Sequence, residues 1–251
     1  MNIVYCLNDN YKLYTATSIY SLMDNKNKDT IYNIFLLHHP DTEISFFNII
    51  EKKFNIKLNF INMGDIANNL FISRHIHTPS YYRLFISEVI PNINRCIYLD
   101  GDTIINKDLT ELYNIDMGNK IIGGVIDIGN ELLKIKFPHL CRKELKPNYI
   151  NSGVLLINIE KLKQINGFDL YTDYLKINPK PYNHDQDVIN FSLEQHIYIL
   201  PHKYNVFNDE WYFNGPDDVI KPLCNILSSE DNSYNYKTIK NNYYNKVITH
   251  Y

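Results

Sequence analysis

The first hundred residues alternate between short apolar runs and longer amphipathic stretches. Runs rich in β-branched and aromatic side chains predict strands at residues 2–6, 32–37, 57–62 and 96–99. Between these runs, residues 14–23 and 43–54 place apolar side chains at helical spacing. Strands that alternate with helices are typical of βαβ units and a parallel sheet. The first half of the chain therefore predicts a Rossmann-like α/β arrangement.

The second half of the chain is less regular. Its apolar runs predict strands at residues 120–127, 149–157 and 197–200, and helices that begin at residue 160 and cover residues 185–194. Residues 205–245 are polar and irregular. Because no internal repeat and no Pro/Gly/Ser-rich linker divides the chain, we expect one α/β domain over residues 1–251. Its first half, residues 1–102, is the expected nucleotide-binding half.

Charge and composition exclude several classes of protein. The 25 Lys and Arg residues against 28 Asp and Glu residues leave a net charge of −3, so no basic surface favours nucleic acid as the partner. No apolar run approaches the roughly 20 residues that a membrane span needs, and the N-terminal segment lacks the pattern of a signal peptide. We therefore expect a cytoplasmic protein with no integral membrane segment. The four scattered cysteines predict buried free thiols.

Two carboxylates one residue apart stand out in the sequence Asp100-Gly101-Asp102, directly after the predicted strand 96–99. In an open parallel sheet, ligands bind outside the carboxyl ends of the strands. The small Gly101 permits a tight turn and a close approach of a ligand, so both carboxylates can converge on one cation. Such hard oxygen ligands suit Mn²⁺ or Mg²⁺ and a substrate phosphate held by the same metal.

The Asp-Gly-Asp motif has other interpretations. A calcium-binding helix-loop-helix fails because Ile104 and Ile105 stand where its later ligands belong. An aspartyl-phosphate phosphatase motif is closer in spelling, but Thr103 follows Asp102 without an intervening glycine, and the motif lies in the middle of the chain. A simple Asp-Gly turn that ends a strand is the remaining structural alternative.

Together with its neighbours, the carboxylate pair resembles retaining glycosyltransferase family 8, the family of glycogenin and of bacterial lipooligosaccharide galactosyltransferases. The segments that carry the resemblance follow one another in order: residues 3–11, Tyr82-Arg83-Leu84, residues 98–102, Asp127, residues 151–158, His184-Asp185-Gln186-Asp187 and His250-Tyr251. The resemblance implies a Rossmann-like nucleotide-diphospho-sugar transferase domain of the GT-A type, with a mixed, mainly parallel central sheet. Residues 103–251 would then form the donor-sugar and acceptor half.

The resemblance also implies a role for each candidate site residue. Asp100, Asp102 and His250 would bind Mn²⁺, with Mg²⁺ as the other candidate metal. Residues implied to bind the nucleotide are Asn8, Asn10, Tyr11, Arg83, Asp100 and Gly101. Residues implied to surround the donor sugar are Asp127, Asn151, Ser152, Asp185 and Gln186, of which Gln186, Asp185 and Asp127 are the candidate catalytic residues.

The implied activity is that of a metal-dependent retaining enzyme. It would move glucose or galactose from a UDP-sugar to a hydroxyl of a saccharide or of a protein-linked glycan. An amide such as Gln186 is a poor nucleophile, so a front-side displacement through an oxocarbenium-like state is the preferred mechanism. Asp185 as a transient nucleophile is the alternative mechanism. Residues 71–82 and 205–245 are candidates for a lid and an acceptor surface.

A second function stays open at this point. Asn8 stands where the family usually has Asp, and the family's Gly-x-x-Lys-Pro-Trp segment after His250-Tyr251 has no counterpart in these residues. Both departures fit a non-catalytic module that binds a UDP-sugar or a partner on the same fold. An amide can still donate and accept hydrogen bonds, so the change at Asn8 is compatible with binding of the base.

Overall fold

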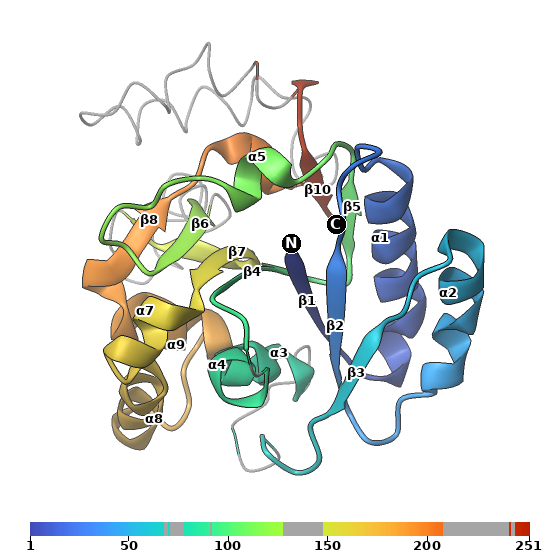
Figure 1. Ribbon diagram of the computed structural model, residues 1–251. Coiled ribbons are helices and arrows are strands. Elements are labelled where there is room, and N and C mark those ends of the chain that lie inside the picture. Colours follow the sequence, from blue (N-terminus) through green and yellow to red (C-terminus); the bar gives the residue numbers. More distant parts are fainter. Residues whose placement is uncertain (68–69, 71–77, 91, 128–147, 208–240, 242–243) are drawn as a thin grey trace, which may run out of the picture.

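The centre of the molecule is a seven-stranded sheet with the strand order β3-β2-β1-β4-β7-β6-β8 (Figure 1). The structure, a computed structural model, describes residues 1–67, 70, 78–90, 92–127, 148–207, 241 and 244–251. The strands of the central sheet are β1 (Asn2–Leu7), β2 (Asn33–His38), β3 (Asn59–Asn62), β4 (Arg95–Leu99), β6 (Ile122–Ile126), β7 (Ile150–Asn158) and β8 (Ile197–Ile199).

Most neighbouring strands of this sheet are parallel. The pairs β1–β2, β2–β3, β1–β4 and β6–β8 run in parallel, whereas β7 runs antiparallel to both β4 and β6. The predicted mixed, mainly parallel sheet is therefore confirmed. Strands from both predicted halves of the chain share this one sheet, while the assignment of a separate role to each half stays a prediction.

Helices cover both faces of the sheet. They are α1 (Lys12–Asp24), α2 (Asn48–Phe54), α3 (Pro79–Tyr82), α4 (Ile86–Val89), α5 (Thr110–Tyr113), α7 (Ile159–Gln164), α8 (Gly167–Ile177) and α9 (His184–Ser192). Short 3₁₀ helices are η1 (Asp9–Tyr11), η2 (Ile44–Phe47), η3 (Arg83–Phe85), η5 (Glu194–His196) and η6 (His202–Tyr204).

Strand β1 shows why its sequence is apolar without interruption. Its successive side chains point to opposite faces of the sheet. Ile3 and Tyr5 belong to the core cluster that contains Ile19 of α1, whereas Val4 belongs to the second cluster, which contains Tyr81 of α3. Because helices cover both faces, both sets of side chains are buried, and a run of apolar residues is the expected pattern for such a strand.

A second, three-stranded sheet was not predicted. Its strands are β5 (Thr103–Ile105), β10 (Ile248–His250) and β9 (Val206–Phe207), and Figure 1 shows β5 and β10 side by side. β10 pairs antiparallel with β5 and parallel with β9. Strands of two or three residues are shorter than the four to eight residues over which strand periodicity is detected. This small sheet bears on the predicted metal site because β10 carries His250.

Several predicted elements differ from the observed ones. The helix expected at 43–54 is divided into η2 and α2, and the strand expected at 57–62 is shorter. The candidate lid at 71–82 is wrong for its last residues, because Tyr81 and Tyr82 of α3 are fully buried in the core, and residues 71–77 lie outside the described residues. In the irregular 205–245 segment the structure describes β9 and a few residues near its end, and the remaining residues lie outside the described ones.

The described cysteines agree with the prediction of buried free thiols. Cys6 and Cys96 are both buried and unpaired, while Cys141 and Cys224 lie outside the described residues. The helices of the described residues include none with the length and apolar character of a membrane span.

His202 is a buried histidine in η6. Among the described residues, neither of its ring nitrogens has a hydrogen-bond partner, and only 3% of the residue is exposed. Burial disfavours the charged imidazolium and lowers the pKa of His202 from 6.5 to about 4. Between about pH 4 and pH 6.5, the unfolded chain therefore carries a proton on His202 that the folded chain lacks.

This proton linkage predicts a loss of stability in acid. The folded pKa is depressed below the unfolded one, so the stabilisation is fully present above pH 6.5 and is lost as the pH falls toward 4. Relative to His202→Phe and His202→Leu, the wild-type chain should lose about 3 kcal/mol of unfolding free energy between pH 7 and pH 4. Urea denaturation at each pH measures the difference. Parallel pH profiles of wild type and both variants would contradict the assignment.

Candidate functional site

A cavity of about 300 Å³ opens at the carboxyl ends of β1 and β4. This is the edge at which open α/β sheets bind ligands. Most of the predicted site residues line the cavity: Asn8, Tyr11, Arg83, Asp100, Asp102, Asn151, Ser152, Asp185 and Gln186. The structure thus brings together residues from the loop after β1, from η3, from the turn after β4, and from β7 and α9, which are far apart in the sequence.

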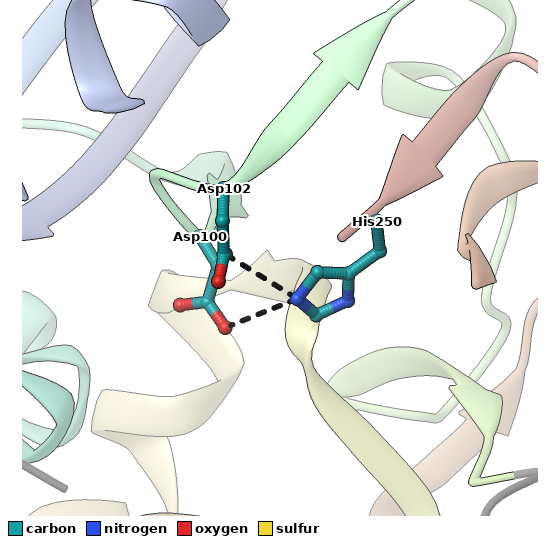
Figure 2. A group of neighbouring side chains, drawn as sticks. All are labelled: Asp100, Asp102 and His250. Atoms are coloured by element: carbon teal, nitrogen blue, oxygen red, sulfur yellow. Dashed lines mark ion pairs between the residues drawn. The ribbon is translucent and has the colours of Figure 1, made fainter. Parts of the chain in front are cut away.

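Asp100, Asp102 and His250 form a cluster of three ligand groups. One ligand atom of each residue lies within 4.8 Å of the others. His250 Nε2 lies 3.4 Å from Asp102 Oδ1 and 3.9 Å from Asp100 Oδ2, and Figure 2 shows both carboxylates directed toward this nitrogen. The two Asp residues lie in the turn between β4 and β5, and β10 places His250 opposite Thr103 of β5. Two carboxylates and an imidazole nitrogen are a donor set that fits Mn²⁺ or Mg²⁺.

Glycines allow this cluster to form. A Cβ on Gly153 would lie 2.3 Å from the His250 ring and 2.8 Å from Asp100 Oδ2, so any side chain there would displace the ligands. Gly101 has a further part that the sequence did not predict. Its missing Cβ faces Thr15 Oγ1 of α1 at 2.4 Å, so this glycine permits the turn to pack against a helix. A role of Gly101 at the nucleotide stays a prediction.

Arg83 joins the carboxylate turn to the start of α9. Its guanidinium is buried, with Nη2 2.9 Å from Asp100 Oδ1 and Nε 3.1 Å from Asp185 Oδ2. Nη1 donates to the Ser152 carbonyl at 2.6 Å and to Ser152 Oγ at 3.2 Å. The guanidinium lies 4.4 Å from the centre of the Tyr98 ring, and the Tyr98 hydroxyl donates to the same Asp100 Oδ1. Asp100 Oδ1 is thereby held in place, while Oδ2 faces His250.

The environment shifts the protonation of two groups of the site. Burial raises the pKa of Asp185 to about 6, although the Arg83 charge acts in the opposite direction. Burial would lower the pKa of His250, but the hydrogen bond with Asp102 and the charge of Asp100 outweigh it, so the pKa is raised.

Gln186 is held by hydrogen bonds on both sides of its amide group. Its Oε1 accepts from the Ser152 backbone N–H at 3.0 Å and from Asn151 Nδ2 at 3.1 Å. Its Nε2 donates to Asp127 Oδ2 at 2.7 Å. Asp127, at the end of β6, therefore reaches the site through Gln186. Asp185 is restrained in a similar way, because its Oδ2 also accepts from Ser152 Oγ at 2.9 Å.

The loop after β1 also lines the cavity. Asn8 caps η1, where its Oδ1 accepts from the Tyr11 backbone N–H at 3.2 Å. Tyr11 is 37% exposed, and its ring centre lies 5.6 Å from that of Tyr14. The exposed face of Tyr11 is available to an aromatic base. Asn10 is exposed on η1 and does not line the cavity in the described structure, so its nucleotide contact stays a prediction.

The whole chain matches one known family. The sequence model described as Glycosyl transferase family 8 matches residues 2–251. The chain belongs to this family. The resemblance inferred from the ordered motifs is thereby confirmed.

Individual relatives of this family 8 chain agree with the assignment. A putative glycosyltransferase of Haemophilus influenzae is 29% identical over 213 residues, which are 82% of this chain and 63% of that protein. A lipopolysaccharide 1,2-glucosyltransferase of Escherichia coli is 29% identical over 212 residues, 81% of this chain and 62% of that protein. The matched region thus spans less than two thirds of either relative. The crystal structure of the galactosyltransferase LgtC with donor and acceptor sugar analogues shares the fold, with a TM-score of 0.76 at 22% identity over all of this chain and 87% of that one.

Three residues that support the family 8 site had no assigned role from the sequence. Tyr98 donates a hydrogen bond to Asp100, and Gly153 leaves room for the side chains of His250 and Asp100. Asn205 contacts both Asn151 and His250. The first two lie inside the matched motifs, where their spacing next to functional residues is the only signal. Asn205 lies in a polar segment that contains many Asn residues, and nothing local distinguishes it.

The burial of Arg83 predicts a large effect on stability. Removing one partner of a buried ion pair leaves uncompensated charge in the interior, so Arg83→Met should lower the free energy of unfolding by about 3–5 kcal/mol. Lys12→Met is the matched control, because Lys12 pairs with Asp9 and Glu43 at the surface and its loss should cost far less. Urea denaturation in EDTA compares the three proteins. Equal losses in both variants would refute the structural role of Arg83.

Proposed function

We propose that this chain is a metal-dependent retaining hexosyltransferase. It moves glucose or galactose from a UDP-sugar to a hydroxyl group of a saccharide or of a protein-linked glycan. The observation that carries the proposal is the convergence of Asp100, Asp102 and His250 at a cavity whose lining also includes the aromatic ring of Tyr11 and the Asp185–Gln186 carboxylate–amide pair.

The groups at the cavity match the parts of a nucleotide-sugar. Asn8 and Tyr11 are suited to the base, with an amide for hydrogen bonding and a ring for stacking. Asp100, Asp102 and the neighbouring His250 would serve the diphosphate through a shared metal. The lining groups left for the hexose are Asp185, Gln186, Asn151 and Ser152.

Asp100, Asp102 and His250 would hold the metal, for which Mn²⁺ is our candidate and Mg²⁺ the second choice. When bound there, the metal neutralises the negative charge that develops on the departing diphosphate. Arg83 would support this chemistry indirectly. It binds Asp100 Oδ1 and leaves Oδ2 of that carboxylate facing His250. The relatives point in the same direction, since one is named a lipopolysaccharide glucosyltransferase and a structural neighbour is a galactosyltransferase.

The restrained side chains favour a front-side mechanism. Asp185 Oδ2 is engaged by Arg83 and Ser152, and the raised pKa of Asp185 indicates a carboxylate that is buried away from water. Gln186 Oε1 already accepts two hydrogen bonds. Neither oxygen is placed as a free nucleophile. In the proposed step the bond from the anomeric carbon to the phosphate oxygen breaks, the acceptor oxygen bonds to that carbon on the same face, and its proton passes to the departing phosphate.

In this mechanism Gln186 contributes its dipole rather than a covalent bond. Its carbonyl oxygen is the negative end of an amide whose other end is fixed on Asp127. A fixed dipole of this kind stabilises positive charge on the sugar ring without reorganisation during the reaction. Asp127 would act through Gln186 as well as by contact with sugar hydroxyls.

The proposal predicts UDP release that depends on a divalent metal. With Mn²⁺ and UDP-glucose or UDP-galactose, the wild-type chain should release UDP, slowly to water and faster with a saccharide acceptor. Asp102→Asn should lower the rate by at least about 100-fold, because charge stabilisation by a metal supplies several kcal/mol to the transition state. A coupled assay for UDP measures the rate.

Asp173→Asn is the control for this assay, since Asp173 lies on the surface of α8 and pairs only with Lys176 among the described residues. It should keep the full rate. If the chain binds UDP only with a divalent metal but forms no UDP from the UDP-sugars, the non-catalytic binding module is favoured over the enzyme. Release of UDP that is the same with EDTA as with Mn²⁺ would refute the metal-dependent mechanism.

A further inference from the structure

Asn205 is a buried amide that contacts two parts of the candidate site. One is His250 of the Asp100–Asp102–His250 ligand group, and the other is Asn151, which lines the cavity. It lies between η6 and β9 and has no exposed surface. Its Nδ2 donates to Asn151 Oδ1 at 2.8 Å, and its Oδ1 lies 3.0 Å from His250 Nδ1. A buried amide can satisfy its donors and its acceptor only if its neighbours supply the complementary groups.

Backbone groups determine the direction of these hydrogen bonds. The Gly153 N–H can only donate, and it donates to Asn151 Oδ1 at 2.9 Å, so this oxygen cannot be exchanged with Nδ2 of the same amide. The atom of Asn205 that faces Asn151 Oδ1 must therefore be the donor Nδ2. Asn205 Oδ1 then faces His250, and His250 Nδ1 must carry the hydrogen that this oxygen accepts.

This direction sets the tautomer of His250. A neutral imidazole carries one hydrogen, so a hydrogen on Nδ1 leaves the lone pair on Nε2. Nε2 is the atom that faces Asp100 and Asp102 in Figure 2. Only a nitrogen with a free lone pair binds a metal ion, and the hydrogen bond made by the other ring nitrogen selects which one that is.

The same series of hydrogen bonds continues into the donor-sugar side. Asn151 Nδ2 donates to Gln186 Oε1, and Gln186 Nε2 donates to Asp127 Oδ2. The Ser152 N–H fixes the orientation of Gln186, as the Gly153 N–H fixes that of Asn151. His250, Asn205, Asn151, Gln186 and Asp127 thus form one series in which each group donates to the next.

We propose that Asn205 is a positioning residue that fixes the metal-binding tautomer of His250. Through its second hydrogen bond it also links His250 to the Asn151–Gln186 pair. The inference rests on the proposed function insofar as Asp100, Asp102 and His250 bind a metal. Loss of Asn205 frees the His250 ring to place its hydrogen on Nε2, toward the nearby carboxylate of Asp102. In that tautomer Nε2 carries a hydrogen and has no lone pair to bind a metal ion.

Two substitutions separate the two contacts of Asn205. Asn205→Leu removes both the acceptor for His250 Nδ1 and the donor for Asn151. Asn205→Asp keeps an acceptor for His250 Nδ1 but sets a carboxylate oxygen against Asn151 Oδ1, so it breaks the coupling alone. Asn190→Leu is the control for loss of a buried amide, because Asn190 bonds to Ile150 and to the Gln186 backbone and makes no contact with His250.

The first measurement needs no metal. In the metal-free protein labelled with ¹⁵N-histidine, two-bond ¹H–¹⁵N correlations at pH 9 report which nitrogen of His250 carries the hydrogen, and the His250→Gln spectrum identifies the signal. We expect a hydrogen on Nδ1 in the wild type, in Asn205→Asp and in Asn190→Leu. We expect partial or complete transfer to Nε2 in Asn205→Leu.

The second measurement is the affinity for Mn²⁺ alone, followed by the electron paramagnetic resonance signal of free Mn²⁺. Asn205→Leu should bind Mn²⁺ about 10–100-fold more weakly, the usual effect of losing a partner of a metal-ligating histidine. Asn205→Asp should stay within about 3-fold of the wild-type affinity, yet its rate of UDP release at saturating Mn²⁺ should fall by at least about 10-fold, the order of effect expected from a small misplacement of groups that orient the substrate. Thermal unfolding of each variant confirms that it is folded.

Several results would overturn the inference. A hydrogen on Nε2 of His250 in the wild type contradicts it directly. So does Asn205→Leu with an unchanged spectrum and unchanged Mn²⁺ affinity, or Asn205→Asp with an unchanged rate of UDP release. If the wild type shows the predicted tautomer but binds no Mn²⁺, the proposed function fails while the role of Asn205 toward His250 stands, so the two failures are distinguishable.

Discussion

The buried guanidinium of Arg83 is the interaction on which the site depends. It brings a carboxylate from the turn after β4 and a carboxylate from the start of α9 to one point, and it also binds the Ser152 carbonyl in β7. Without this cation, the buried carboxylate of Asp185 and the partly buried carboxylate of Asp100 would be two neighbouring charges of the same sign. The pairing therefore holds the turn after β4 and the start of α9 against β7, and residues of these segments line the cavity.

The three-stranded sheet β5-β10-β9 positions the third side chain of the cluster, His250. β10 is held between β5 and β9, and this pairing brings His250 from the last residues of the chain to a turn formed about 150 residues earlier. Asn205, next to β9, then fixes the ring of His250 from the other side. The candidate metal ligand His250 is thus positioned by strands of two or three residues, whose register depends on tertiary contacts rather than on intrinsic strand propensity.

The large elements and the family could be predicted from the sequence, whereas the short strands and the long-range contacts that position the side chains could not. β1, β2, β4 and α1 have apolar periodicities long enough to identify, and Asp100-Gly101-Asp102 has few interpretations once the neighbouring motifs are considered. The β5–β10–β9 sheet falls below that length. The alignment of Asn205 with His250 arises from a hydrogen bond across 45 positions, which no local pattern reveals. Gly101 shows the same limit, because only the fold reveals that its missing side chain faces Thr15.

The central claim of this account is that a divalent metal joins Asp100, Asp102 and His250 to the diphosphate of a uridine nucleotide. Calorimetric titration of the protein with UDP, once with Mn²⁺ and once with EDTA, tests this claim most directly. We predict a one-to-one complex in Mn²⁺ and at least about 100-fold weaker binding in EDTA, as expected if the metal supplies several kcal/mol to the contact with the diphosphate. Equal affinity for UDP in the two solutions, or no binding in Mn²⁺, would contradict the account.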